Sequence, residues 1–169
     1  FAQVVMEEEI KEIEVRIQPV HGWSYFQHHQ WEVWFKGYLI NHDFRALFRE
    51  LIADETMTTG FFKQKLKEIR GHFAFVLWSK DYLFASTDKV RSIPLFFWTT
   101  GEKFVVTSKA RNFVQSERVG SDQIKREAAL SFAMAGYVTG KGTLYRGLET
   151  LKAGYCLVYN RKRGETELV

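Results

Sequence analysis

The stretch GHFAFVLW at residues 71–78 is dominated by aromatic and branched apolar side chains, the composition of a buried β-strand. A polar turn at 79–81 separates it from a second apolar run, YLFAS at 82–86. Another pair follows, PLFFW at 94–98 and FVVT at 104–107, joined by a turn that contains glycine. Two strand pairs in succession, each joined by a short turn, predict an antiparallel meander at the centre of the chain.

Helical patterns flank this centre on its N-terminal side. Over residues 44–52, apolar side chains recur at spacings of three and four, after Asn41 and Asp43, either of which is a suitable N-cap. This pattern predicts a helix over 44–52. A second helix is predicted over 61–69, with Gly71 placed to end it.

A third helix is predicted over residues 121–135, with Ser121 or Asp122 as its cap. Its inner face is expected to carry Ala128, Ala129, Phe132 and Ala133.

Further strands are predicted near both ends of the chain. Alternation of apolar and polar residues over 13–17 favours a strand there, although the charged residues 6–15 could also form a short helix. WEVWF at 31–35 predicts a strand that Gly37 ends, and GYCLVY at 154–159 predicts a late strand. Helices and strands in this order predict an α+β domain.

Composition bounds the class of protein. The chain has 169 residues, 46% hydrophobic and 26% charged, which excludes a disordered chain and predicts a single domain over 1–169. The net charge of +4 is spread along the chain, so no nucleic-acid partner is expected. No apolar run approaches the roughly 20 residues of a membrane helix, so no membrane partner is expected and a cytoplasmic location is predicted.

Metal and disulfide sites are not expected either. The single cysteine, Cys156, excludes an intrachain disulfide and a multi-cysteine zinc site, and it is predicted to be a small buried side chain. His21, His28 and His29 lie close together in sequence, but their spacing fits no familiar ligand pattern.

Several motifs, in order along the chain, resemble the glutaminase-type domain of the asparagine synthetase family. KGYLIN at 36–41 is similar to that family's Asn-Gly-Glu-Ile-Tyr-Asn, and GHFAF at 71–75 to its Gly-x-Phe-Ala-Phe. DKVRSIPLF at 88–96 resembles Arg-Asp-x-x-Gly-x-x-Pro-Leu-Tyr, and FVVTSKAR at 104–111 stands where the family has a strand ending in Ala-Ser-Glu-x-Lys. Residues 136–154 follow its Gly-Tyr-Val…Leu-x-Pro-Gly run.

This resemblance covers about residues 16–154 and implies a fold. The expected architecture is the four-layer α-β-β-α sandwich of mainly antiparallel sheets found in N-terminal-nucleophile hydrolases.

The resemblance also implies a reaction and shows where this chain departs from it. In the family, an N-terminal cysteine attacks glutamine, its α-amine acts as base, and an asparagine side chain with a glycine N–H stabilises the oxyanion. Here the first residue is Phe1, and Lys36 stands at the asparagine position, while Gly37 retains the backbone amide. The family's Arg-Gly-Pro loop and its Gly-Ser-Asp segment have no counterpart. No catalytic residue is therefore predicted.

Three binding residues are carried over from the family. Arg16 matches the arginine that grips the glutamine carboxylate, with a solvated strand arginine as the alternative interpretation. Lys36 and Gly37 occupy the oxyanion positions, although Lys36 could also be an exposed lysine at a strand end.

Two functions follow from these observations. The resemblance favours a catalytically degenerate domain that forms the N-terminal scaffold of an ATP-dependent amide-forming enzyme, because relatives that cyclise β-lactams or lasso peptides also carry a glutaminase-like domain without the cysteine. ATP and Mg²⁺ would belong to a synthetase domain of the same or another chain, because no Ser-Gly-Gly-x-Asp-Ser loop occurs in these residues. No cofactor is expected in this domain. The alternative is a stand-alone, non-enzymatic binding or structural module on the same fold.

Overall fold

The structure, a computed structural model, describes residues 12–40, 42–53, 59–100, 103–138, 142–161 and 165–168. Phe1 and Asn41, to which the sequence assigned roles, lie outside the described residues. The elements in chain order are β1 (Glu12–Arg16), β2 (Trp23–His28), β3 (Trp31–Leu39), α1 (Phe44–Ala53), α2 (Thr59–Glu68), β4 (Gly71–Trp78), β5 (Tyr82–Thr87), β6 (Phe96–Thr100), β7 (Lys103–Thr107), α3 (Ala110–Ser116), α4 (Arg126–Ala135), β8 (Glu149–Thr150), β9 (Cys156–Asn160) and β10 (Glu165–Leu168).

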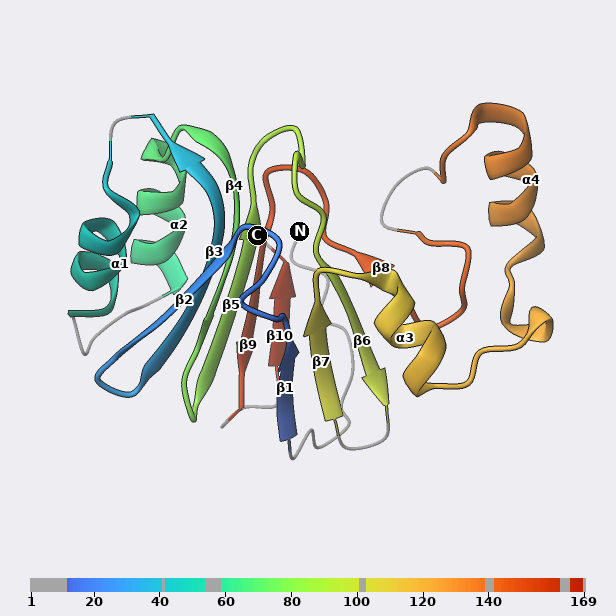
Figure 1. The fold of residues 1–169 in the computed structure, drawn as a ribbon, viewed down its shortest axis with the longest axis horizontal. Coiled ribbons are helices and arrows are strands. Elements are labelled where there is room, and N and C mark those ends of the chain that lie inside the picture. Colours follow the sequence, from blue (N-terminus) through green and yellow to red (C-terminus); the bar gives the residue numbers. More distant parts are fainter. Residues whose placement is uncertain are drawn as a thin grey trace.

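The strands form two sheets that face each other (Figure 1). The six-stranded sheet has the order β10-β9-β5-β4-β3-β2 and is antiparallel throughout. The four-stranded sheet has the order β1-β7-β6-β8, and within it β1 pairs with β7 in parallel. The sheets are therefore mainly antiparallel, as predicted.

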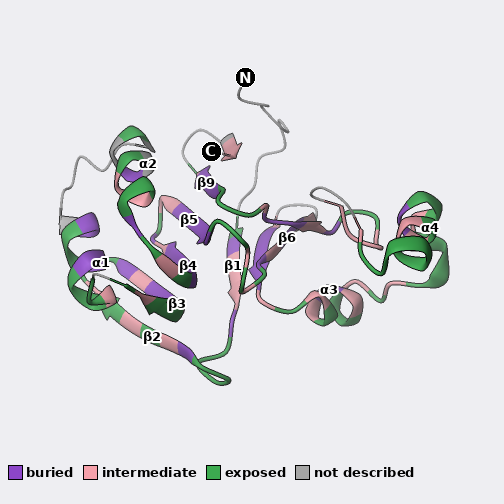
Figure 2. Ribbon diagram, turned by 90° about the horizontal axis from the view of Figure 1, so that it is seen from above, coloured by how far each residue is buried: buried purple, intermediate pink, exposed green. Residues whose placement is uncertain are grey.

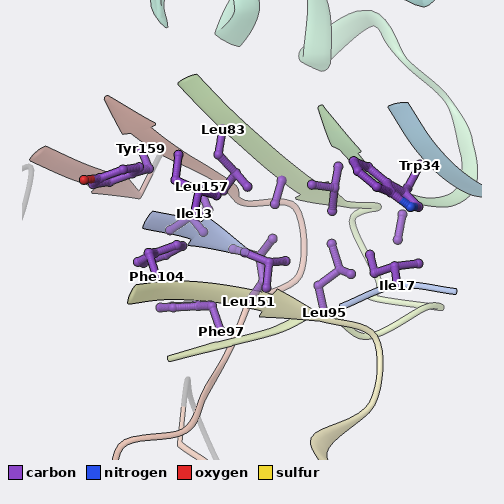
Figure 3. Packing of buried hydrophobic residues seen from close by; sticks show 14 of the residues in the cluster. Ile13, Ile17, Trp34, Leu83, Leu95, Phe97, Phe104, Leu151, Leu157 and Tyr159 are labelled. Atoms are coloured by element: carbon purple, nitrogen blue, oxygen red, sulfur yellow. The ribbon is translucent and has the colours of Figure 1, made fainter. Parts of the chain in front are cut away.

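The space between the sheets is filled by one cluster of buried side chains, the inter-sheet core (Figure 3). It consists of Ile13, Ile17, Trp23, Trp34, Ala74, Val76, Leu83, Ala85, Leu95, Phe97, Phe104, Val106, Leu151, Leu157 and Tyr159. Because side chains alternate between the two faces of a strand, residues of this cluster recur at every second position, as in Leu83 and Ala85 of β5.

Two further clusters fix the helices on the outer faces. The helix-side core joins the six-stranded sheet to α1 and α2 and includes Phe48, Leu51, Phe62, Phe75 and Cys156. The outer core joins the four-stranded sheet to α3 and consists of Trp98, Val105, Phe113 and Leu148. Three interfaces of this kind make four layers, α-β-β-α, and confirm the predicted α+β sandwich.

The local signals upstream of the centre are confirmed with small shifts. Helix α1 begins after Asp43, whose carboxylate accepts a hydrogen bond from the backbone N–H of Ala46 at 2.9 Å. Strand β3 does not end at Gly37 but continues to Leu39, because the glycine adopts φ +108° within the strand.

The prediction of one central meander is wrong. The hairpin β4–β5 belongs to the six-stranded sheet, whereas the hairpin β6–β7 belongs to the four-stranded sheet. The segment from Asp88 to Leu95 crosses from one sheet to the other. Residue alternation identifies strands and turns, but it carries no information on which sheet a hairpin joins.

The predicted third helix is divided in the structure. A 3-10 turn occupies Ser121–Gln123, and α4 follows only from Arg126. Of the expected inner face, Ala128 is buried, whereas Phe132 is 50% exposed and Ala133 is exposed too. Figures 1 and 2 show the reason: α4 stands beside the sandwich and does not cover either sheet.

Candidate functional site

A small cavity opens at one end of the sandwich, where β1 and β7 of one sheet meet β2 and β3 of the other. Its volume is about 170 Å³. The lining residues are Arg16, Gln18, Val20, His21, Trp23, Lys36, Ile93, Pro94, Ser108, Lys109 and Asn112. We call it the inter-sheet pocket. It brings together two of the predicted binding residues, Arg16 and Lys36, although Gly37 does not line it.

Lys36 reaches the pocket because of its position on β3. Trp34, two residues earlier, belongs to the inter-sheet core, and strand alternation places Lys36 on the same face. The ammonium donates a hydrogen bond to the carbonyl oxygen of His21 at 2.7 Å. His21 has φ +57° in the turn that leads to Gly22, and a side chain at Gly22 would lie 3.6 Å from Cε of Lys36. The turn therefore holds this ammonium at the wall of the pocket.

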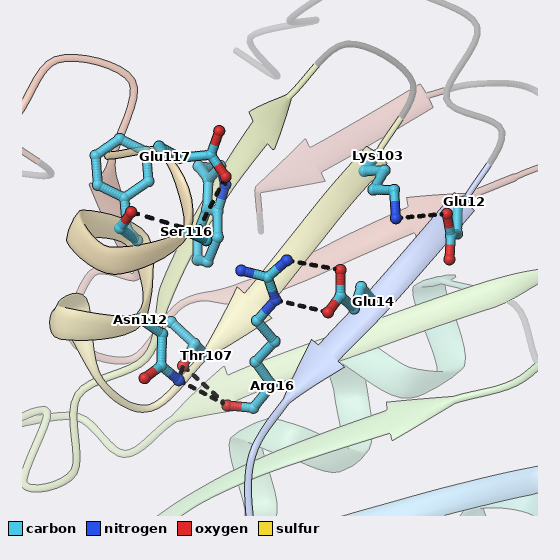
Figure 4. Close-up of polar contacts among 10 residues, drawn as sticks. Glu12, Glu14, Arg16, Lys103, Thr107, Asn112, Ser116 and Glu117 are labelled. Atoms are coloured by element: carbon cyan, nitrogen blue, oxygen red, sulfur yellow. Dashed lines mark hydrogen bonds and ion pairs between the residues drawn. The ribbon is translucent and has the colours of Figure 1, made fainter. Parts of the chain in front are cut away.

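The charged end of Arg16 lies on the other side of its strand. Ile13 and Ile17 belong to the inter-sheet core, so Arg16 projects from the outer face of the four-stranded sheet. Figure 4 shows that Nε and Nη2 donate to the two carboxylate oxygens of Glu14, at 2.6 and 2.9 Å. The guanidinium also lies 5.3 Å from the centre of the Trp98 ring.

This ion pair explains the electrostatics of Arg16. The hydrogen bonds that Arg16 donates to Glu14 raise the pKa of Arg16 and lower the pKa of Glu14. The main chain of Arg16 is held as well, because its carbonyl oxygen accepts from Oγ1 of Thr107 at 2.9 Å and Nδ2 of Asn112 at 3.4 Å. That Arg16 grips a ligand carboxylate stays a prediction.

Gly37 is positioned by a close approach of two strands. An added Cβ would lie 1.9 Å from the carbonyl oxygen of His72 on β4. Gly71 mirrors it, since a Cβ there would lie 2.1 Å from the carbonyl oxygen of Tyr38. The backbone at Gly37 thus requires glycine for packing, whatever its N–H does for a ligand.

One wall of the pocket is built by a turn that Asp88 organises. Its carboxylate is buried and accepts hydrogen bonds from the backbone N–H groups of Phe73 (3.1 Å), Val90 (2.9 Å) and Ser92 (3.1 Å). Burial by itself raises the pKa of Asp88, but these hydrogen bonds outweigh it and lower the pKa overall. The turn passes through Arg91 at φ +53° and leads to Pro94 at the pocket.

Cys156 is placed away from this pocket. It is 1% exposed and belongs to the helix-side core, on the opposite face of the six-stranded sheet. The prediction that Cys156 is a small buried side chain is confirmed. A second cavity of about 640 Å³ lies on that side, lined by Cys156 together with Phe73, Asp88 and residues of α2 and β10.

The side chains that line the inter-sheet pocket determine which reactions it could catalyse. The described residues of its lining include the hydroxyl of Ser108 but no thiol or carboxylate. Among the described residues, no histidine or carboxylate hydrogen-bonds to Ser108, so nothing there would activate it as a nucleophile. No group of three metal-ligating side chains occurs in the described parts of the chain.

Sequence reasoning missed part of this site. Ser108 and Asn112 line the pocket, and Asn112 lies on α3, a helix that was not predicted. The helix has seven residues and carries only one buried side chain, Phe113, so its apolar periodicity is too weak to identify it. Lys109, which also lines the pocket, stands where the family's Ala-Ser-Glu-x-Lys motif has glutamate.

None of the helices in the described ranges is long and apolar enough to cross a membrane.

The comparisons with known proteins agree with this architecture. Among solved structures, the chain is similar to the glutamine phosphoribosylpyrophosphate amidotransferase of B. subtilis complexed with ADP and GMP, at 15% identity and a TM-score of 0.50, over 90% of this chain and 31% of that one. A structure described as the allosteric regulatory enzyme of purine biosynthesis gives 16% identity and a TM-score of 0.48, over 90% and 30% of the two chains.

The chain thus spans about a third of these structures, and the likeness to the first shows the fold alone, that of N-terminal-nucleophile hydrolases. No curated protein matches. A family model described as a glutamine amidotransferase domain matches residues 41–168. The chain therefore belongs to the glutamine amidotransferase domain family.

Proposed function

We propose that this chain is a catalytically degenerate glutamine amidotransferase domain that acts as the N-terminal scaffold of an ATP-dependent, amide-forming enzyme of the asparagine synthetase type. The observation that carries the proposal is the lining of the inter-sheet pocket, in which Lys36 stands at the position of the oxyanion asparagine and the described residues include no thiol. Cys156 is buried on the face of the six-stranded sheet that points away from this pocket.

Two features of the pocket support the loss of glutamine hydrolysis. Lys36 stands at the position of the oxyanion asparagine, and its ammonium is hydrogen-bonded to the turn at His21. No carboxylate occurs among the described residues of the lining, so the α-ammonium group of glutamine finds no anionic partner among them. An oxyanion donor and an amine-binding acid are separate requirements, and the loss of each multiplies the loss of rate.

The scaffold role is supported by the exposed surface of α4. Leu130 and Phe132 on this helix are 62% and 50% exposed, Met134 is 80% exposed, and Tyr137 just beyond it is 62% exposed. Leu130 and Met134 are four residues apart and share one face of α4, and exposed apolar side chains of this size are typical of a contact with another domain. ATP and Mg²⁺ would act in that synthetase domain, on the same or another chain, and this domain would hold no cofactor.

Glutaminase activity tests the first half of the proposal. The full-length protein, incubated with glutamine, should release no ammonia above buffer, and the electrophilic analogue 6-diazo-5-oxonorleucine should leave its mass unchanged. Ammonia release, or labelling of Cys156 or Ser108, would overturn the loss of catalysis. The Cys156→Ala variant serves as the control for non-specific alkylation.

The coding sequence downstream of Val169 tests the second half. The proposal expects a synthetase domain with a Ser-Gly-Gly-x-Asp-Ser type pyrophosphate loop. A reading frame that ends without it, in a protein that co-purifies with no ATP-dependent ligase, would contradict the scaffold role and favour a stand-alone module.

A further inference from the structure

The inter-sheet pocket has an unbalanced charge. Lys36 and Lys109 line it, and within the described parts of the chain neither side chain forms an ion pair with a carboxylate. The charge of Arg16, the third cationic residue of the lining, is balanced by Glu14 on the outer face of the sheet. None of the described residues that line the pocket is acidic. The interior of the pocket is therefore cationic.

The ammonium of Lys36 is the charge best placed to meet a ligand. It has three N–H donors, and one of them is used by the carbonyl oxygen of His21. That hydrogen bond holds the ammonium at the wall of the pocket. A donor held in this way loses little conformational entropy when it binds an anion.

The other walls define the size and shape of the ligand. Trp23, Ile93 and Pro94 present apolar surface, and Ser108 adds a hydroxyl. The volume is about 170 Å³, and a cavity of about 150 Å³ is enough for a benzene molecule. The pocket therefore suits a short aliphatic chain that ends in an anionic group.

We propose that the inter-sheet pocket binds a small carboxylate that carries no ammonium group, and that Lys36 selects a carboxylate over a carboxamide at its end of the pocket. A ligand ammonium is disfavoured because the lining offers it cations and no carboxylate. The inference rests on the proposed function, in which this pocket no longer hydrolyses glutamine, and it names the class of ligand that the degenerate pocket retains.

Four probes of the same carbon skeleton separate the two requirements. Glutarate has two carboxylates and no amine, glutaramate replaces one carboxylate by a carboxamide, glutamate adds an amine to glutarate, and glutamine has both changes. Binding of each to the full-length protein is measured by calorimetry or by ligand-observed NMR. We expect glutarate to bind most tightly and glutamine most weakly.

Substitution of Lys36 tests whether this side chain causes the preference for glutarate over glutaramate. A charge-assisted hydrogen bond is worth about 1.5–3 kcal/mol, so Lys36→Met should weaken glutarate binding by about tenfold or more. The same substitution should leave the affinity for glutaramate nearly unchanged, so the preference for glutarate over glutaramate should disappear. Lys80→Met, in the exposed turn between β4 and β5, removes the same charge far from the pocket and should bind glutarate like the wild type.

The outcomes separate this inference from the proposed function. Glutamine bound more tightly than glutarate, without ammonia release, would overturn the inference and leave the proposed function intact. Glutamine bound more tightly and hydrolysed would overturn both. Unchanged glutarate affinity in Lys36→Met would overturn the role of Lys36.

Discussion

Gly37 and Gly71 lie close together where the end of β3 meets the start of β4, Gly37 opposite Phe73 and Gly71 opposite Leu39. Each has a positive φ, +108° and +147°, and each would place a Cβ against a backbone carbonyl of the other strand. A backbone atom cannot move aside as the end of a flexible side chain can. These two positions therefore tolerate no side chain, and the close approach of β3 and β4 depends on them.

Substitution of Gly37 by alanine should lower the free energy of unfolding by at least about 3 kcal/mol, because a strained φ adds to a direct clash with His72. Gly136→Ala is the matched control. Gly136 also has a positive φ, +77°, but has no atom within 4 Å of an added Cβ, so the cost should be about 1 kcal/mol. Urea denaturation of both variants measures the difference, and equal costs would show that the clash is relieved.

Asp88 stabilises the cross-sheet segment through its charge, and this predicts a pH dependence. Its pKa in the folded protein is lowered from the usual 3.8, so its contribution is complete above about pH 4 and is lost as the pH falls through the folded pKa. Asp88→Asn should cost about 1–3 kcal/mol at pH 7, because an amide cannot accept from all three N–H groups.

The same variant should be less sensitive to acid than the wild type. Unfolding free energies at pH 7 and pH 3 measure both effects. The exposed Asp122→Asn should change the stability by less than about 0.5 kcal/mol at either pH. A loss of stability in acid that is identical in the wild type and Asp88→Asn would contradict the role of this carboxylate.

The elements that sequence could predict are those with a local signal. Helix α1 follows from apolar spacing and from Asp43 as a cap, and the strands of both hairpins follow from their composition. The short helix α3 was not predicted. On α4, the prediction that Phe132 lies on a buried inner face is wrong, because apolar periodicity leads to burial only where another element covers that face of the helix.

Helices α3 and α4 should respond differently to truncation. Phe113 on α3 is buried against Trp98, with ring centres 5.3 Å apart, so Phe113→Ala should cost about 3–5 kcal/mol. Phe132 on α4 is half exposed, and Phe132→Ala should change the stability of the isolated chain by less than about 0.5 kcal/mol. Thermal or urea unfolding measures the loss of stability in both variants. A large loss in Phe132→Ala would mean that α4 packs against the rest of the chain in solution.

At the scale of the site, the sequence predicted which residues share a pocket better than it predicted their orientation. Lys36 and Arg16 do line one cavity. The direction of the Arg16 guanidinium, toward Glu14 and the outer core, depends on which face of β1 is covered. The alternation over 13–17 places Arg16 opposite Ile13 and Ile17, but the outer core that it meets there is built by residues far along the chain, which no local pattern reveals.

The molecule as a whole should unfold in one transition. Phe104 of one sheet stacks on Tyr159 of the other, with ring centres 5.3 Å apart, and the inter-sheet core holds both sheets together. Tryptophans lie in each core, Trp34 between the sheets, Trp31 on the helix side and Trp98 in the outer core, so their emission reports all the layers.

The midpoints of urea unfolding followed by tryptophan fluorescence and by far-ultraviolet circular dichroism should therefore coincide. Separate midpoints would show that the two sheets unfold independently.

The parallel pairing of β1 with β7 has a consequence for the nascent chain. Arg16 meets Thr107, which follows it by 91 residues, and the ribosome adds about 5–20 residues per second. Strand β1 therefore waits roughly 5–18 s for its neighbour to be made. During that interval β1 lacks the strand that satisfies its backbone hydrogen bonds within the four-stranded sheet. Translation speed and chaperone supply should thus govern the yield of folded protein, and β1 is the segment that most needs protection during synthesis.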